Sequence, residues 1–413
     1  MSTTNSALEG IRVIDMSRVF AAPVGGQILG DLGADVIKIE RPIVGDDGRG
    51  YGLAWLKGKD GIDTRQSSFF TVSNRNKRSI TVNHAKPEGQ EIIRKLAETA
   101  DVLIENFKVG DLKRYGLDYD SLRQINPGLI YCSVTGYGQT GPMAARPGYD
   151  GLFQATGGMM AVTGIPDGLP GAGPLKAGPS LVDFVTGHNI AIAILGALQY
   201  RNRTGDGQFI DIALLDTSVA MVSHIMQDYL LSGEAPPRLG NGGNGGGPAD
   251  LMHCQDGIVY LTAGTDEHWR RLTVLMKQPE LFEDPRFDSN LKRGKQNRAE
   301  LMAIINEWSR GWTVAGILAA LDEVGVPAAR YNELPEVWDE PQVKHRQLRA
   351  TTPHAYAEAG SVDLIASPLA KMSASPATIR RAPPMLGEHT REILEDLGYD
   401  DARIAALQEL KII

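Results

Sequence analysis

The sequence has few of the residues that cross-link small or secreted domains. Only two of its 413 residues are cysteines, Cys132 and Cys254, and neither belongs to a Cys-x-x-Cys pair. We therefore expect neither a disulfide framework nor a structural zinc site, and no other metal site is predicted. No unbroken apolar run reaches the length of about 18 residues that spans a membrane, and residues 1–10 lack the apolar segment of a secretory signal. The expected location is the cytoplasm, without a membrane partner.

A strong excess of charge of one sign is also missing. The net charge is −8, from 42 basic and 50 acidic residues that are interleaved along the chain. Because the basic runs are short, a nucleic acid is not expected as a partner. Glycine, in contrast, is abundant at 47 residues, which indicates many tight turns and close approaches of the backbone to a ligand.

Several catalytic signatures are absent. The sequence contains no Gly-x-Ser-x-Gly elbow, no Walker phosphate loop and no His-Glu-x-x-His zinc motif. A dinucleotide site would have Gly-x-Gly-x-x-Gly between a strand and a helix, but Gly25, Gly26 and Gly30 fall inside a predicted helix, where close packing on a sheet explains them. His188 falls on an apolar helix, so packing explains it more simply than ligand binding does.

The chain instead alternates short apolar strands with helices. In order, the expected elements are a strand at 11–16, a helix at 21–32, and strands at 35–40, 79–82, 101–105 and 130–134, followed by a helix at 184–200 and a strand at 209–214. This alternation is typical of an α/β protein with an open, mostly parallel, Rossmann-like sheet. The loop at 236–248, rich in Gly, Pro and Asn, marks the change to a smaller second domain.

An ordered series of short motifs runs through the chain. In order these are Arg-Val-Phe-Ala-Ala-Pro (18–23), Gly-Asp-Leu-Gly-Ala-Asp-Val-Ile-Lys-Ile-Glu-Arg-Pro (30–42), Asn-Arg-Asn-Lys-Arg-Ser-Ile (74–80), Glu-Asn-Phe (105–107), Tyr-Gly-Leu (115–117), Thr-Gly-Tyr-Gly-Gln-Thr-Gly-Pro (135–142), Gly-Tyr-Asp (148–150), Asp-Phe-Val-Thr-Gly (183–187) and Arg-Ala-Pro-Pro-Met-Leu-Gly-Glu-His-Thr (381–390). Each motif is weak alone, but the whole series in this order is highly specific. It resembles the class III coenzyme A transferases, which include formyl-CoA:oxalate and succinyl-CoA:dicarboxylate transferases, from about Leu8 to Ile413.

The resemblance implies that Asp183 is a covalent nucleophile. A carboxylate can attack the carbonyl carbon of an acyl-CoA to give a mixed anhydride, and the released CoA thiolate then converts the anhydride to an aspartyl-CoA thioester. An incoming acid runs the same steps in reverse. From the residues alone, the alternative is that Asp183 only caps the helix expected at 184–200.

The resemblance also assigns residues to coenzyme A, which would be a substrate and not a tightly bound cofactor. It implies a phosphate contact at Arg114 and an adenine contact at Arg41, although a solvated surface charge is the alternative for both. Thr135 stands where some oxalate-type members have lysine, which puts a contact there in doubt. The remaining implied CoA-binding residues are Val19, Ala21, Asn106, Phe107 and Tyr137.

The glycine-rich stretch at 240–247 resembles the loop that closes over the intermediate in oxalate-type members. Gly245, Gly246 and Gly247 are therefore candidates for a lid, with Tyr149 as a further substrate contact. The alternative is a flexible linker between domains.

The class resemblance implies an interlocked homodimer whose large domain is built from both ends of each chain. The expected boundaries are a large CoA-binding domain at 1–215, a linker with the glycine-rich loop at 216–248, a small α+β domain at 249–330, a linker at 331–350 and the completion of the large domain at 351–413.

The expected activity is transfer of CoA between small carboxylic acids, and two other functions remain open. Motifs 135–142 and 40–47 are most similar to transferases that use dicarboxylates, whereas the glycine loop is similar to oxalate-type members. An acyl-CoA racemase of the same fold would have Gly-His-Asp at 148–150, where this chain has Tyr149, a poor base at neutral pH. The third function is that of a CoA-binding protein without catalysis.

Overall fold

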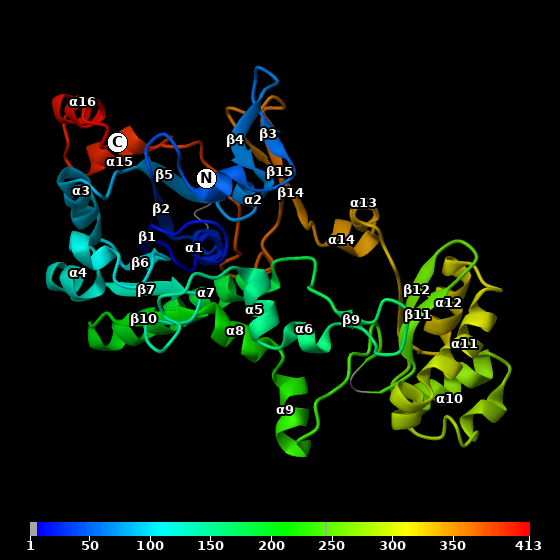
Figure 1. Cartoon of the computed structure of the whole chain (residues 1–413). Coiled ribbons are helices and arrows are strands. Elements are labelled where there is room, and N and C mark those ends of the chain that lie inside the picture. The colour runs from blue at the N-terminus through cyan, green and yellow to red at the C-terminus, as the bar shows by residue number, and fades with distance from the viewer. Residues whose placement is uncertain (1–5, 244–245) are drawn as a thin grey trace. The chain divides into compact units, whose positions relative to one another are not determined.

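The computed structural model describes residues 6–243 and 246–413. The chain forms two compact units, and the first of them contains both chain ends (Figure 1). The first unit consists of Met1–Gly157, Gly178–Met221 and Gln342–Ile413, and the second of Gly158–Ala177 and Val222–Pro341. The domain boundaries expected from the sequence stay predictions. One segment of the second unit, Gly158–Ala177, lies inside the range that the sequence assigned to the large domain.

A six-stranded sheet forms the centre of the first unit, in the order β10-β7-β6-β1-β2-β5, and all neighbouring strands are parallel. The predicted α/β fold with an open parallel sheet is thus confirmed. The strands are β1 (Arg12–Asp15), β2 (Asp35–Glu40), β5 (Lys77–Thr81), β6 (Val102–Glu105), β7 (Ile130–Thr135) and β10 (Phe209–Ala213). Most of their side chains are buried on both faces, which is why the strands appear in the sequence as continuous apolar runs.

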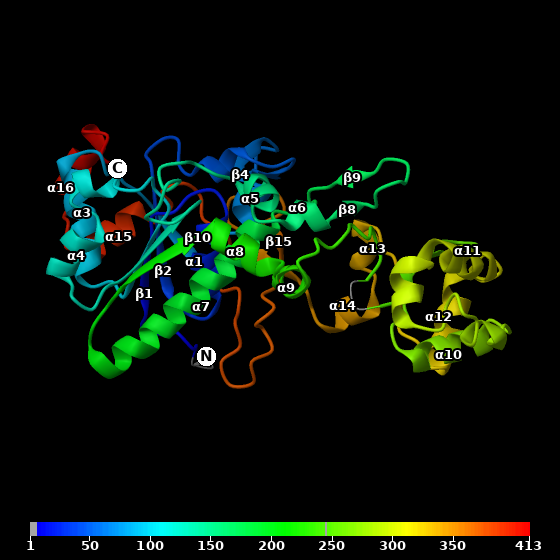
Figure 2. The same cartoon turned by 60° about the horizontal axis from the view of Figure 1, so that its bottom comes forward.

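Helices cover both faces of this sheet (Figure 2). One apolar core joins it to α3 (Pro87–Glu98), α4 (Tyr119–Ile125), α15 (Thr390–Asp396) and α16 (Asp401–Glu409). The core on the other face joins it to α1 (Ala21–Asp31) and α7 (Leu181–Thr204). The C-terminal helices therefore complete the layer that α3 and α4 begin.

The helices α1 and α7 approach each other closely because each has a glycine where they cross. A Cβ atom on Gly25 would lie 2.6 Å from Cγ2 of Ile190, and one on Gly187 would lie 2.5 Å from Cγ1 of Val24. Neither position has room for a side chain unless a helix moves. The expectation that Gly25 packs on the sheet is therefore corrected, since its partner is another helix. This crossing fixes the first turns of α7 beside the start of α1.

By length and composition alone, α7 could cross a membrane, with a mean hydropathy of 1.7 over its most apolar window. The core helix of a globular domain passes the same test, and 44% of that window is buried within the fold. Its buried side chains belong to the core on the α1 face of the sheet. We therefore interpret α7 as a core helix that leaves one apolar side uncovered in a single chain.

The basic motif at 74–80 is paired with carboxylates inside the fold. Lys77 Nζ lies 2.8 Å from Oδ2 of Asp15, and both side chains are fully buried. Arg75 Nη2 lies 2.6 Å from Oδ2 of Asp31, again in the interior. Through these two pairs the motif supports the sheet and α1.

The second unit has a separate apolar core around the antiparallel sheet β11 (Ala249–His253), β12 (Ile258–Thr262) and β13 (Ala328–Arg330). Three helices cover this sheet: α10 (Asp266–Leu275), α11 (Arg298–Ser309) and α12 (Val314–Glu323). Three two-stranded sheets lie outside these two sheets. They pair β3 (Trp55–Lys57) with β4 (Asp63–Ser67), β8 (Gly164–Ile165) with β9 (Gly173–Pro174), and β14 (Arg349–Pro353) with β15 (Ser361–Ile365). The remaining α-helices of the chain are α2 (Ser68–Thr71), α5 (Asp150–Thr156), α6 (Met159–Val162), α8 (Leu214–Met221), α9 (Ser223–Ser232), α13 (Leu334–Val337) and α14 (Pro341–His345).

Candidate functional site

Asp183 lies in the wall of a cavity of about 310 Å³ in the first unit. The other walls come mainly from the segments that follow β1 (18–21) and β6 (106–109), and from the end of β7 and the loop after it (134–136 and 144–149). These segments meet at the carboxyl edge of the parallel sheet, where open α/β folds bind their ligands. The sheet topology therefore brings Asp183 to the edge at which a substrate is expected.

The first turn of α7 is held by a carboxylate from another helix. α7 begins at Leu181, so Asp183 is its third residue and does not cap it. Oδ1 of Asp150, the first residue of α5, instead accepts the backbone N–H groups of Val182 at 2.8 Å and of Asp183 at 3.3 Å. Asp150 thus performs the capping that the sequence assigned to Asp183 as an alternative, and it leaves the Asp183 carboxylate available to the cavity.

The carboxyl group of Asp183 is unusual in its electrostatics. Burial, and secondarily the like charge of Asp150, raise the pKa of Asp183 to about 7. Among residues 6–243 and 246–413, no cation forms an ion pair with it. At neutral pH such a group is partly ionised and a stronger nucleophile than an ordinary aspartate.

The loop after β1 lines the same cavity through strained backbone. Val19 has φ +71°, a left-handed conformation that is unusual for a β-branched residue, and its N–H donates to Oδ1 of Asp46 at 2.8 Å. Asn106 fixes the neighbouring residue, since its side-chain amide both accepts the N–H of Arg18 and donates to the carbonyl of Arg18. Strain of this kind is common at ligand sites.

A second cavity, of about 230 Å³, shares Arg18 and Phe107 with the first. It is lined by Arg41 and His84, and the His84 ring packs edge-on against Phe107 at 5.1 Å. Arg41 pairs with Asp47, which also binds Arg18. The two cavities together extend the site from Asp183 toward Arg41.

The structure brings most of the residues implied by the sequence to these two cavities. Val19, Ala21, Asn106, Phe107, Tyr149 and Asp183 line the first, and Arg41 lines the second. Two do not line either cavity. Arg114 pairs with Asp111 at 3.1 Å, and the Tyr137 ring packs against Phe153 with centroids 5.1 Å apart.

Sequence reasoning gave no role to three residues of the site. Arg18 and Arg146 line the first cavity, and Asp150 holds α7. The signal for Asp150 was present, because it completes the Gly-Tyr-Asp triplet at 148–150. Only its pairing with α7, about thirty residues later, required the folded structure.

The proposed glycine lid falls in the second unit. Gly245 lies outside the described residues. Gly247 donates its N–H to Oδ1 of Asn290 at 2.8 Å and accepts from Nε of Arg293 at 3.0 Å, and a Cβ on Gly246 would lie 2.2 Å from the Asn290 amide. These contacts show that both glycines are packed against Asn290 and Arg293 of the same unit, and the lid stays a prediction.

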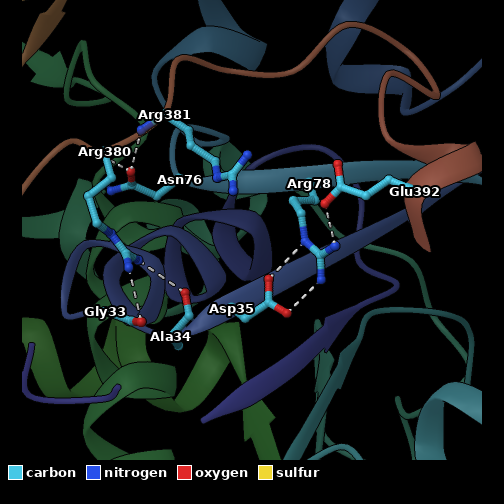
Figure 3. A pocket seen from close by; sticks show the side chains of 8 residues that line it. All are labelled: Gly33, Ala34, Asp35, Asn76, Arg78, Arg380, Arg381 and Glu392. Atoms are coloured by element: carbon cyan, nitrogen blue, oxygen red, sulfur yellow. Dashed lines mark hydrogen bonds and ion pairs between the residues drawn. The ribbon is translucent and has the colours of Figure 1, made fainter. Parts of the chain in front are cut away.

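A larger cavity of about 600 Å³ lies at the opposite edge of the sheet, where β2 begins with Asp35 (Figure 3). Arg78 binds Asp35 at 2.6 Å and Glu392 at 2.8 Å, and Arg380 donates to the carbonyl groups of Gly33 and Ala34 at 3.2 Å (Figure 3). Both carboxylates of this cavity are paired with Arg78. It therefore offers no free nucleophile.

Comparison with known proteins gives consistent matches over the whole chain. A family model described as CoA-transferase family III matches residues 8–390. The chain is 41% identical over 398 residues to a succinate–glutarate CoA-transferase of Agrobacterium fabrum, which covers 96% of this chain and 97% of the relative. It is 36% identical over 407 residues to the succinyl-CoA:glutarate CoA-transferase of Homo sapiens, covering 98% and 90%. The solved structure of a CAIB/BAIF family protein from Brucella suis has a TM-score of 0.84 at 40% identity, over 95% of this chain and 100% of that one.

Proposed function

The chain belongs to CoA-transferase family III, and from this premise we propose that it moves CoA from an acyl-CoA to a small dicarboxylic acid through a thioester on Asp183. The observation that carries the proposal is the Asp183 carboxyl itself. It lines the cavity at the carboxyl edge of the sheet, it has no cationic partner among the described residues, and its pKa is raised to about 7 by burial and then by Asp150.

The reaction proceeds in four covalent steps. An oxygen of ionised Asp183 attacks the thioester carbon, and the CoA thiolate leaves, which forms a mixed anhydride. The thiolate then attacks the Asp183 side-chain carbon, the donor acid leaves as a carboxylate, and the enzyme holds CoA as an aspartyl thioester. The acceptor carboxylate attacks this thioester, and the returning thiolate takes the acyl group from the new anhydride. The final attack regenerates the free Asp183 carboxylate.

The position of Asp183 in α7 suits this chemistry. It is the third residue of a helix of 24 residues, so the developing oxyanion lies near the positive end of the helix dipole. The hydrogen bonds from Val182 and Asp183 to Asp150 hold this turn in place while the side chain changes from carboxylate to anhydride to thioester.

The two adjacent cavities support CoA as the bound nucleotide. Phe107 lines both cavities and Asn106 lines the first, so the pantetheine arm would lie along this segment. Arg41 and Arg18 at the second cavity supply cationic groups for phosphate or stacking with adenine. The relatives from Agrobacterium fabrum and Homo sapiens act on succinate and glutarate by name, which supports dicarboxylates as the exchanged acids.

An exposed apolar side of α7 supports a homodimer. Phe184, Ile192, Leu195 and Tyr200 are 44%, 66%, 37% and 42% exposed, respectively, although they belong to a helix at the centre of the fold. Large apolar surface of this kind is usually covered by a partner. We propose that a second copy covers it, in the interlocked arrangement that the class resemblance implies. Light scattering at micromolar concentration should give twice the mass of one chain, and a monomer would refute the dimer.

The experiment that tests the function traps the intermediate. Enzyme mixed with succinyl-CoA alone should gain the mass of CoA, and hydroxylamine should convert the modified side chain to a hydroxamate, because thioesters and anhydrides react with this amine whereas carboxylates do not. Peptide mapping should place the mark on Asp183. A mark on Asp150 or Asp211, or no mark on an enzyme that turns over, would contradict the mechanism.

A further inference from the structure

The cavity of Asp183 contains a cation whose presence the reaction at Asp183 does not explain. Arg146 lines this cavity and is exposed to it, and no hydrogen bond or ion pair of its side chain is found within residues 6–243 and 246–413. Arg18, in the same cavity, is paired with Asp47 at 3.3 Å and stacks over Phe107. A guanidinium without a carboxylate partner beside a nucleophilic carboxylate is available for an anionic group of the substrate.

The segment that contains Arg146 is fixed at both of its ends. A Cβ on Gly136 would lie 2.7 Å from Cζ of Phe153, and one on Gly148 would lie 2.1 Å from the same atom. The Phe153 ring is fully buried in the core. The intervening loop is therefore anchored where it leaves and rejoins the fold, so the position of Arg146 is set by the core and not by a mobile tip.

Within the loop, the backbone around Arg146 is further restricted. Its N–H donates to the carbonyl of Met143 at 2.9 Å, and Pro147 follows it. A residue before proline is held in extended conformations. Four residues later comes Asp150, which holds the first turn of α7. Arg146 thus belongs to the same short segment as the group that positions Asp183.

We propose that Arg146 is the specificity residue that binds the remote carboxylate of a dicarboxylic acid while its other carboxylate reacts at Asp183. This inference rests on the proposed function. Lys108, a second cation that lines this cavity and has no ion pair among the described residues, lies on the segment after β6 and also lines a separate cavity beside Glu105 and Tyr131. Of the two cations, only Arg146 belongs to the segment that ends at Asp150 and so at the first turn of α7, and the proposal assigns the remote carboxylate to Arg146.

The test compares two acceptors that differ only in the remote group. Succinate has a carboxylate where succinamate has a neutral amide of the same size. Enzyme that already holds CoA as a thioester is mixed with each acid, and the rate of acyl-CoA formation is measured for wild type, Arg146→Gln and Arg146→Lys. This design removes the donor step, so any difference belongs to the acceptor.

Wild-type enzyme should prefer succinate over succinamate by roughly tenfold to a hundredfold, the value of one charge-assisted contact. Arg146→Gln should lose this preference by slowing succinate and leaving succinamate within about twofold, whereas Arg146→Lys should retain part of it. Lys108→Gln is the matched control, which should change both acids by the same factor. Arg203→Gln, an exposed arginine about 30 Å along α7 from Asp183, should change neither.

Two results would overturn the assignment. One is an undiminished preference for succinate in Arg146→Gln, and the other is an equal loss for both acids in that variant while its thermal unfolding matches wild type. A wild-type enzyme that forms no CoA thioester would remove the proposed function and this inference together. A thioester that reacts equally with both acids would remove only the inference.

Discussion

The buried charged side chains on and next to β1, β2 and β5 form ion pairs, whereas the carboxyl group of Asp183 forms none within the described part of the chain. In the first region each of three buried cations has a carboxylate within hydrogen-bonding distance: Lys77 and Asp15 at 2.8 Å, Arg75 and Asp31 at 2.6 Å, and Arg49 and Glu40 at 2.7 Å. At the cavity, Asp183 faces a second carboxylate, Asp150, and has no cationic partner among the described residues. The buried charges of the first region are thus neutralised by ion pairs, whereas the carboxyl group of Asp183, on α7, is not. Glu105, at the end of β6, likewise has no ion pair among the described residues, and burial raises its pKa to about 7.

The difference shows where the fold accepts a cost in stability. A buried ion pair needs close geometry and further hydrogen bonds to offset its desolvation, and Lys77 has both, since Nζ also contacts Pro23 O and Asn74 Oδ1. An unpaired buried carboxylate has no such compensation, and its pKa rises instead. A nucleophilic carboxylate must have no cationic partner, because a cation paired with Asp183 would lower its nucleophilicity.

The largest effect should follow from removing the unpaired charge. Asp183→Asn keeps the size and the backbone contacts of the residue but cannot form an anhydride, so we expect transfer to fall by about three orders of magnitude or more. Binding of CoA and the unfolding temperature should change little. Steady-state transfer with succinyl-CoA and glutarate measures the loss. Substantial activity in freshly made protein, checked for deamidation to aspartate, would contradict a nucleophilic role.

Breaking a buried ion pair should instead lower the stability of the fold. Lys77→Met leaves Asp15 buried without its cation, which should lower the free energy of unfolding by about 3–5 kcal/mol. The pair of Lys57 and Asp63 has a similar distance, 2.7 Å, but its side chains are 54% and 51% exposed, so Lys57→Met should lower stability far less than Lys77→Met. Urea unfolding measures both variants. Equal losses would show that burial does not separate the two pairs.

The elements of the fold were largely predictable, because local patterns determine them. β2 was expected at the residues where it lies, and the other strands of the sheet lie within a residue or two of their expected bounds. The start of α7 was placed three residues late. Its first turn depends on Asp150, which is 33 residues from Asp183 in the chain, and no local pattern reports such a contact.

The functional site was predictable only in part, because its contacts also join residues that are far apart in the chain. The family motifs pointed to Asp183, but the sequence did not show which carboxylates pair with the basic motif at 74–80. Arg75 and Lys77 find theirs 44 and 62 residues away, at Asp31 and Asp15. Arg146 carried no motif signal of its own, and only the cavity identifies it.

The raised pKa of Asp183 should appear in the pH dependence of transfer. Only the ionised carboxylate attacks, so kcat/KM should rise with pH through about 7. Asp150→Asn removes the smaller of the two causes and should move this limb to lower pH by less than about one unit. Asp206→Asn, an exposed carboxylate beyond the end of α7, should leave it in place. A limb near pH 4 in wild type would contradict the raised pKa.

The smallest effect should be on stability, and its sign follows from the same pKa. Between the value of about 3.9 for an unfolded aspartate and about 7 in the folded protein, the folded chain binds a proton that the unfolded chain has lost. The contribution of Asp183 to the free energy of unfolding therefore falls as pH rises through this window, and above pH 7 the ionised group is a net cost.

Asparagine has no charge to desolvate. Asp183→Asn should accordingly be more stable than wild type at about pH 8, by about 1 kcal/mol after solvent screening, and the gain should vanish near pH 4. Urea unfolding at both pH values measures this difference in the free energy of unfolding. A variant no more stable than wild type at the higher pH would show that other groups stabilise the ionised Asp183 carboxylate.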